Sequence, residues 1–222
     1  MRLRLNQLES ELKKKLFPVY LVTGDEPLLV QEAVDNIRTY CKKAGFDERK
    51  ILEVDRKFDW NFINDDANAL SLFADKTLTE LRLSKFKPGV PGGKSLQKYC
   101  DNLPEDKILL ISANKLEAAT LKSKWCSKLD QTGAIIQIWP IGLDEMPRWI
   151  AQRANRLSLN IENDAISLLS DRLEGNLLAA QQELEKLKLL IPDRQITCTD
   201  ILESVSDASK YDIFNLTDAC LQ

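Results

Sequence analysis

The first 140 residues of the chain alternate short β-rich runs with helical stretches, and two of the runs are continuously apolar. Residues 108–111 read ILLI and residues 134–136 read AII, without the polar alternation of a strand that has one solvated face. Strands that are buried on both faces have such runs, and helices must cover them. The pattern therefore predicts an α/β domain built on a parallel sheet.

Turn and capping residues divide this region into elements. We expect five strands, at residues 18–23, 51–54, 76–83, 107–112 and 134–139. We expect helices between them, at residues 27–44, 60–70, 95–102 and 118–131. Pro27 suits the first turn of a helix, and Gly45 ends that helix. The stretch KPGVPGG, residues 87–93, is predicted to be a loop.

Beyond Pro140 and Gly142 the pattern is helical only. We expect helices at residues 144–157, 163–173, 177–190 and 199–204. Residues 1–140 are therefore assigned to the sheet domain and residues 141–208 to a small helical domain. A further helix is expected from Tyr211, and the sequence stops within it, so residues 209–222 are expected to open another, truncated domain.

Several classes of chemistry are excluded by residue usage. The chain has no histidine, which removes serine–histidine triads, cysteine–histidine dyads and histidine metal sites. Its five cysteines are far apart, odd in number and never in a C-x-x-C pair. They indicate buried free thiols in a reducing compartment rather than disulfides or zinc ligands.

The global properties argue against a membrane and against bulk nucleic-acid binding. No run approaches the ~20 apolar residues that span a bilayer, and the N-terminal sequence has no apolar signal-peptide region. We therefore expect a cytoplasmic protein. The net charge of −3 provides no general basic surface for nucleic acid.

The nucleotide-binding positions of such a sheet domain lack their functional groups. After the first predicted strand, residues 24–27 read GDEP, where a phosphate-binding loop needs lysine and a hydroxyl group. The strand at residues 107–112 ends in Ser112 and is followed by Ala113, where a magnesium-binding acid would be needed. We therefore expect no ATP hydrolysis, no catalytic residue, no cofactor and no metal.

A second candidate, GGKS at residues 92–95, resembles the end of a Walker A loop. That loop requires its first glycine where this chain has Pro88, and Gly89 is one residue too close. Pro91 also removes a backbone donor from any phosphate cradle. A flexible surface loop is favoured here over a nucleotide site.

Residues 68–76, NALSLFADK, cannot bury all their apolar side chains with one periodicity. In a helix, Leu70 and Phe73 share a face and Leu72 points elsewhere; in a strand, Leu70 and Leu72 share a face and Phe73 turns away. The pattern alone leaves two interpretations open. The segment is either a helix-to-strand junction packed into the core or an apolar tip that fills a partner's pocket.

This segment resembles the clamp-binding element of the clamp-loader delta subunits of bacterial DNA polymerase III, whose apolar loop ends in Ser-Leu-Phe. The similarity extends over nearly the whole chain. YLVTGDEPLLVQEAVDNIR resembles the first strand, altered phosphate loop and first helix of that family. MPRWIAQRANRLSLNIENDAISLL and EGNLLAAQQELEKLKLL resemble its helical domain.

The resemblance implies an AAA+ architecture, with a RecA-like parallel-sheet domain without functional Walker motifs, an all-helical lid domain, and a C-terminal collar domain that is missing here. It implies a non-catalytic subunit of DNA polymerase III that binds the beta sliding clamp and opens the ring for loading onto primed DNA. The implied partners are the clamp, the clamp-loader ATPase subunits and delta-prime, with primer–template DNA reached through the assembled complex. The alternatives are a nucleotide-dependent AAA+ ATPase, which would need Walker groups, and a delta-prime-like stator, which would need cysteine-ligated zinc or an arginine finger.

By position, the resemblance assigns clamp binding to Leu70, Leu72 and Phe73, with Ser71 as the spacer between the leucines. Asn68 stands where clamp-binding peptides often have glutamine. Its shorter amide keeps the hydrogen-bonding chemistry but reaches less far.

Overall fold

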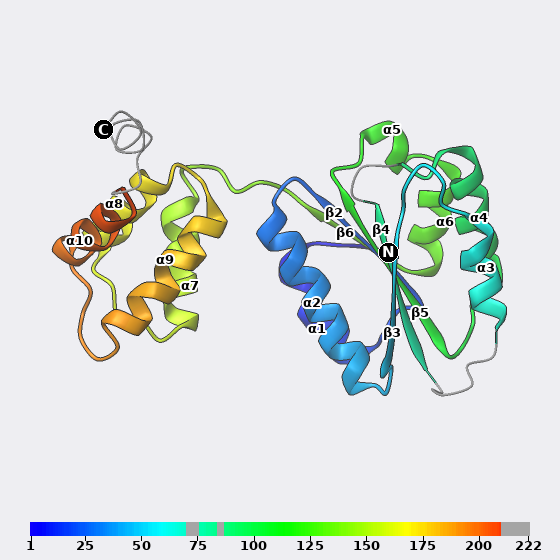
Figure 1. Cartoon of the computed structure of the whole chain (residues 1–222), viewed down its shortest axis with the longest axis horizontal. Helices are drawn as coiled ribbons and strands as arrows, with labels where there is room; N and C mark the ends of the chain where they lie inside the picture. The colour runs from blue at the N-terminus through cyan, green and yellow to red at the C-terminus, as the bar shows by residue number, and fades with distance from the viewer. Residues whose placement is uncertain (70–75, 84–86, 210–222) are drawn as a thin grey trace, which may run out of the picture. The chain divides into compact units, whose positions relative to one another are not determined.

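A computed structural model describes residues 1–69, 76–83 and 87–209 of the chain (Figure 1). Two compact units divide between Pro140 and Ile141. Each unit has its own layers and core and is described by itself.

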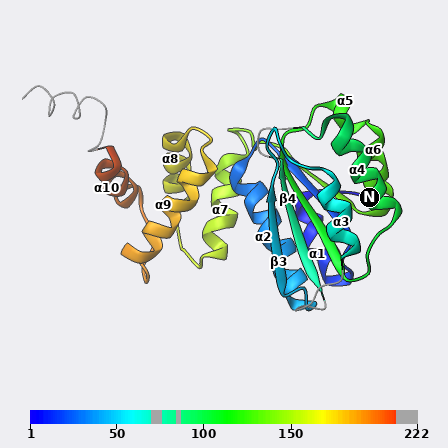
Figure 2. The same cartoon turned by 45° about the vertical axis from the view of Figure 1, so that its right-hand side comes forward.

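The first unit is built on a six-stranded parallel sheet with the order β1-β6-β2-β5-β4-β3. Its strands are β1 (Arg2–Leu3), β2 (Val19–Gly24), β3 (Glu48–Glu53), β4 (Thr77–Leu83), β5 (Lys107–Asn114) and β6 (Ala134–Ile138). Its helices are α1 (Leu5–Lys14), α2 (Pro27–Lys43), α3 (Asn61–Asn68), α4 (Gly89–Asp101), α5 (Ala118–Leu121) and α6 (Lys124–Thr132). α1 and α2 cover one face of the sheet, and α3, α4 and α6 cover the other (Figures 1 and 2).

The predicted α/β class and parallel sheet are confirmed. The central strands β2 and β5 have almost every side chain buried, including Leu21 and Ile111, because helices cover both faces. β3 lies at one edge of the sheet, and its residues alternate between half-buried and exposed. The core of this unit therefore lies on both sides of β2 and β5.

The second unit is helical, with α7 (Met146–Arg156), α8 (Asn163–Leu173), α9 (Leu177–Leu190) and α10 (Cys198–Ser209). Its apolar core includes Ile150, Leu169 and Leu184, each fully buried. Asn176 caps α9 by accepting a hydrogen bond from the backbone N–H of Ala179 at 3.0 Å. The helix expected from Tyr211 lies outside the described residues.

The cysteines behave as buried thiols where the structure describes them. Cys41, Cys100 and Cys126 are buried, and Cys198 is half-buried. Burial raises the pKa of the Cys41 thiol to about 12 and that of Cys126 to about 11. Thiolate is the reactive form of cysteine, so these side chains are packing residues.

The loop predicted at residues 87–93 was wrong from Gly89 onward, because α4 begins there, six residues before the helix expected at residues 95–102. Proline is tolerated in a first helical turn, so Pro91 does not prevent the helix. The glycines are packing residues: a Cβ on Gly92 would lie 2.6 Å from the Trp60 ring, and a Cβ on Gly93 would lie 3.2 Å from the ring of Trp125. Two tryptophans can therefore approach this helix closely.

Three further differences concern β1 with α1, the start of β3, and the helix expected at residues 118–131. β1 and α1 were not predicted, and β1 exists by pairing with β6, Leu3 opposite Ile136. β3 begins at Glu48, three residues before the predicted strand, because it pairs with β4 from Thr77 onward. The helix expected at residues 118–131 is divided into α5 and α6, with Ser123 as the N-cap of α6.

Candidate functional site

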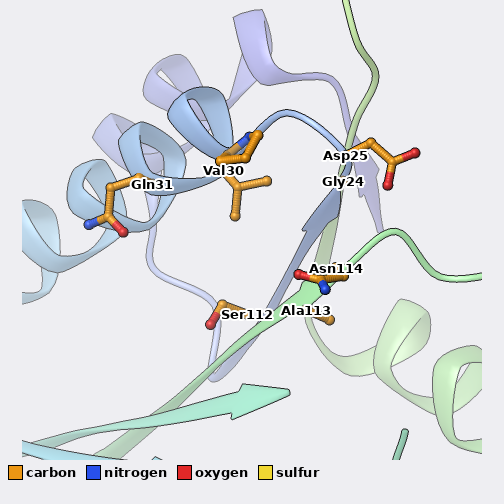
Figure 3. Close-up of a pocket in the computed structure, with 8 residues that line it drawn as sticks. Gly24, Asp25, Val30, Gln31, Ser112, Ala113 and Asn114 are labelled. Carbon is orange, nitrogen blue, oxygen red and sulfur yellow. The ribbon is translucent and has the colours of Figure 1, made fainter. Parts of the chain in front are cut away.

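A pocket of about 380 Å³ opens at the carboxyl ends of β2 and β5, and we call it the carboxyl-edge pocket. It is lined by Gly24, Asp25, Pro27, Val30, Gln31, Ser112, Ala113 and Asn114. Figure 3 shows the end of β5 facing the turn from β2 into α2. The two strands are paired in parallel, with Gly24 opposite Asn114, so their ends meet at one edge. Open α/β sheets bind ligands at this edge.

The groups that line the carboxyl-edge pocket do not suit a nucleotide. Among the residues that the structure describes, Asp25 is the only charged one that lines the pocket, and it pairs with Lys115 at 2.7 Å. Ser112 and Ala113 line the pocket at the position where a nucleotide site would need a magnesium-binding acid. A triphosphate in this pocket would meet the Asp25 carboxylate, and none of the described lining residues is a lysine or an arginine.

The start of α2 is equally unsuited to phosphate. Helix N-termini bind anions through exposed backbone N–H groups. Pro27, in the first turn of α2, has no backbone N–H and so removes one of these donors. Burial raises the pKa of the neighbouring Glu26 carboxyl, an effect that the backbone N–H of Leu28 partly offsets. Gly24 is explained by packing, since a Cβ there would lie 2.5 Å from the carbonyl oxygen of Ile138.

The predicted clamp-binding residues fall in the sequence between the end of α3 and the start of β4, two points that lie at the opposite, amino edge of the sheet. Leu70, Ser71, Leu72 and Phe73 lie outside the described residues. Asn68 is described: it is the last residue of α3 and is exposed. Its Nδ2 donates to the carbonyl oxygen of Asn64 at 2.8 Å, so half of its amide is engaged with its own helix.

Asp106, the residue before β5, and Lys107, its first residue, bond the residues that precede and follow residues 70–75. The Nζ of Lys107 donates to the carbonyl oxygens of Asp66 and of Ala69, the latter at 2.6 Å. The carbonyl oxygen of Asp106 accepts a hydrogen bond from the backbone N–H of Thr77 at 2.9 Å. Lys107 is only 3% exposed. Sequence reasoning missed its role, and the available signal was a lysine at the head of an otherwise apolar strand.

The rest of α3 is held by a buried polar network. The Nδ2 of Asn64 donates to the hydroxyl of Ser95 at 2.6 Å, and that hydroxyl donates to the carbonyl oxygen of Trp60. The carboxylate of Asp66 accepts from Lys50 at 2.9 Å and from the Thr79 hydroxyl at 3.3 Å. α3 is therefore fixed to α4, β3 and β4 near both of its ends.

A second charged cluster lies on β4, beyond this segment. Glu80 is buried and receives paired hydrogen bonds from Arg38 of α2 and from Arg49 of β3. Burial opposes ionisation, but the hydrogen bonds from Arg38 and Arg49 outweigh it and hold the pKa of Glu80 below its ordinary value. The cluster joins α2, β3 and β4 and is a structural ion network.

Other site classes find no support in the part of the chain that the structure describes. Within it, no three His, Cys, Asp or Glu side chains are grouped so that they could hold a metal ion. No helix among the described residues is long and apolar enough to cross a bilayer.

Comparison with known families identifies relatives of both units. A profile described as DNA polymerase III, delta subunit, matches residues 20–138, and a profile described as a middle domain matches residues 143–203. The DNA polymerase III subunit delta of Escherichia coli K12 is 34% identical over 99% of this chain and 64% of its own length. The subunit delta of Haemophilus influenzae is 31% identical over 97% of this chain and 63% of its own length.

Solved structures show the same fold. The DNA clamp loader delta protein of Bacillus subtilis matches with a TM-score of 0.66 and 20% identity, over 90% of this chain and 61% of that one. The Holliday junction branch migration motor RuvB of Thermotoga maritima matches with a TM-score of 0.54 and 12% identity, over 90% of this chain and 68% of that one. The present chain thus spans less than two thirds of the length of the two curated relatives.

Proposed function

Since the chain belongs to the DNA polymerase III delta subunit family, we propose that it binds the beta sliding clamp and opens the clamp ring for loading onto primed DNA. The observation that carries this proposal is the contrast between the two edges of its sheet. The described residues at the carboxyl edge lack the groups for nucleotide chemistry, while at the amino edge the residues that precede and follow the apolar sequence 70–75 are anchored by hydrogen bonds.

We assign clamp binding to Leu70, Leu72 and Phe73, with Ser71 as the spacer and Asn68 as a minor contact. Short apolar anchors of this kind bind by filling a partner's pocket, and a few of them carry most of the binding energy. The hydrogen bond from Asn68 to its own helix supports a minor role for this residue. Clamp opening in this proposal is mechanical, driven by binding energy.

We propose that the chain has no ATPase activity of its own and that ATP is used by other clamp-loader subunits. Asp25 and Glu26 stand where a phosphate-binding lysine would be needed, which disfavours the alternative of a nucleotide-dependent AAA+ ATPase. The separate, buried positions of Cys41, Cys100 and Cys126 likewise disfavour a zinc-bearing, delta-prime-like stator.

The remaining assignments follow from the same proposal. Residues 1–140 would be the RecA-like domain and residues 141–208 the lid domain of a cytoplasmic clamp-loader subunit. Its partners would be the clamp-loader ATPase subunits and delta-prime, with primer–template DNA reached through the assembled complex.

The test is a binding measurement between the chain and the immobilised beta clamp. Replacement of both Leu72 and Phe73 by alanine should weaken binding about 1,000-fold, since each hot-spot anchor contributes about 2 kcal/mol. A matched control replaces Leu189 and Leu190, two exposed leucines of α9, by alanine and should bind as the unchanged chain does. Equal affinity of a folded Leu72→Ala/Phe73→Ala variant and the unchanged chain would refute the assignment of the site.

A further inference from the structure

We propose that Lys107 is a positioning residue for the clamp-binding segment: by bonding carbonyls at the end of α3, it fixes the described residue that directly precedes residues 70–75 in the chain. This inference rests on the proposed function and adds to it a residue that does not touch the clamp.

The contacts of Lys107 explain why a cation is buried there. The last carbonyls of a helix have no partner within the helix, and the helix dipole makes that end negative. Lys107 donates to the carbonyl oxygen of Ala69, and it shares the carbonyl oxygen of Asp66 with the backbone N–H of Ala69. Ala69 is the C-cap of α3 and already has an extended backbone, so the chain changes direction at the residue that Lys107 holds.

Hydrogen bonds also hold the residues that follow residues 70–75, Lys76 and Thr77. Thr77 donates its backbone N–H to the Asp106 carbonyl, and its hydroxyl donates to Glu48 at 3.1 Å. Lys76 donates to the carbonyl oxygen of Ala44 at 3.1 Å. Ala69 is therefore tied to the first residue of β5, and Lys76 and Thr77 are tied to the end of α2, to β3 and to the residue before β5. The next residues of β5, Ile108 and Leu109, are fully or almost fully buried.

Fixed ends raise the fraction of molecules in which the segment is ready to bind. The apparent dissociation constant equals the intrinsic constant divided by that fraction, so losing the anchor should act on the association rate constant. Loss of a direct contact, as in Leu72→Ala, should act mainly on the dissociation rate constant. These two rate constants separate a positioning residue from a contact residue.

The experiment compares association and dissociation rate constants for the immobilised beta clamp. Lys107→Met keeps the length of the side chain and removes its donors. We expect the association rate constant to fall about tenfold, with a dissociation rate constant within about twofold of that of the unchanged chain. The folded fraction of the variant should stay unchanged, because partial unfolding would also slow the apparent association.

Two control variants isolate the effect. Lys128→Met removes a lysine that pairs with Asp101 on α4, so it matches the change in charge. Thr23→Val removes buried hydrogen bonds to Asn114 and Leu116 at the other edge of the sheet, so it matches the loss of a buried polar contact. Both should associate with the clamp as fast as the unchanged chain.

The outcomes are distinguishable. If the unchanged chain binds and Lys107→Met associates equally fast, or the controls slow equally, the positioning role is refuted and the proposed function stands. If the unchanged chain does not bind the clamp, both are refuted. Should Lys107→Met not fold, Lys107→Gln keeps one donor group and should show a smaller fall in the association rate constant. An unchanged rate constant in folded Lys107→Gln, or failure of both variants to fold, would also refute the positioning role.

Discussion

Replacing Glu80 by glutamine should destabilise the sheet unit by about 2–3 kcal/mol. Breaking a buried ion pair by removing one partner costs about 3–5 kcal/mol, because the other charge stays buried without compensation. The side chain of Glu80 is 3% exposed and that of Arg38 is 19% exposed, which places this pair in the buried class. Arg49 is 40% exposed, so solvent screens its share and the lower value follows.

The assay is native-state hydrogen exchange resolved by peptide. Amides of β4 in Glu80→Gln should lose protection about 30- to 150-fold, the equivalent of the expected loss in free energy. Peptides from α9, in the other unit, should be unchanged and serve as an internal control. Glu53→Gln is the matched variant, since Glu53 is 74% exposed and pairs with Arg82 at 3.3 Å, and it should cost less than about 0.5 kcal/mol.

The pH dependence provides an independent check. Because the folded-state pKa of Glu80 is lowered from its ordinary 4.5, its contribution is fully present above pH 4.5 and is lost as the pH falls through the folded-state pKa. The stability difference between the unchanged chain and Glu80→Gln should therefore be constant near neutrality and shrink in acid. β4 protection in Glu80→Gln within 0.5 kcal/mol of the unchanged chain, about the value of a surface pair, would refute the reasoning.

Two further predictions follow from the packing and the pocket. Gly92→Ala should destabilise the sheet unit by about 1–2 kcal/mol in urea denaturation, because its Cβ would lie 2.6 Å from the Trp60 ring. Gly93→Ala, whose Cβ would lie 3.2 Å from the Trp125 ring, should be neutral or stabilising. Equal effects of the two substitutions would contradict the packing role of Gly92. Calorimetric titration with ATP and Mg²⁺ should show no saturable binding, and a dissociation constant below about 1 mM, equivalent to 4.1 kcal/mol, would contradict our interpretation of the carboxyl-edge pocket.

The elements that sequence predicted well are those with local signals. α8 and α9 have the predicted bounds because capping residues and helical periodicity mark them in the sequence itself. β2 and β5 were found from their apolar runs, since burial on both faces needs no knowledge of the neighbours. The meeting of Gly24, Ser112 and Ala113 at one edge was also predictable, because they lie at the carboxyl ends of neighbouring parallel strands.

What sequence could not provide depends on contacts between distant residues. The GGKS stretch was predicted as a loop because glycine is a poor helix former, and only the approach of Trp60 and Trp125 explains its place in α4. β1 is two residues long and exists through β6. The only signal for Lys107 was its place at the head of an apolar strand, and its partners could not be predicted, because they are backbone carbonyls about forty residues earlier in the chain.

The strand β5 runs from one edge of the sheet to the other, and its burial gives the proposed role a physical basis. β5 begins with Lys107, which holds the stem of the clamp-binding segment, and ends with Asn114, which lines the carboxyl-edge pocket. Between them Ile108, Leu109, Leu110 and Ile111 are at most 3% exposed. A strand buried in this way resists deformation, because close-packed interiors have low compressibility. In the proposed function, the end of α3 that precedes the binding segment is thus bonded to a buried strand, as is needed if binding energy is to act on a ring rather than to deform the sheet unit.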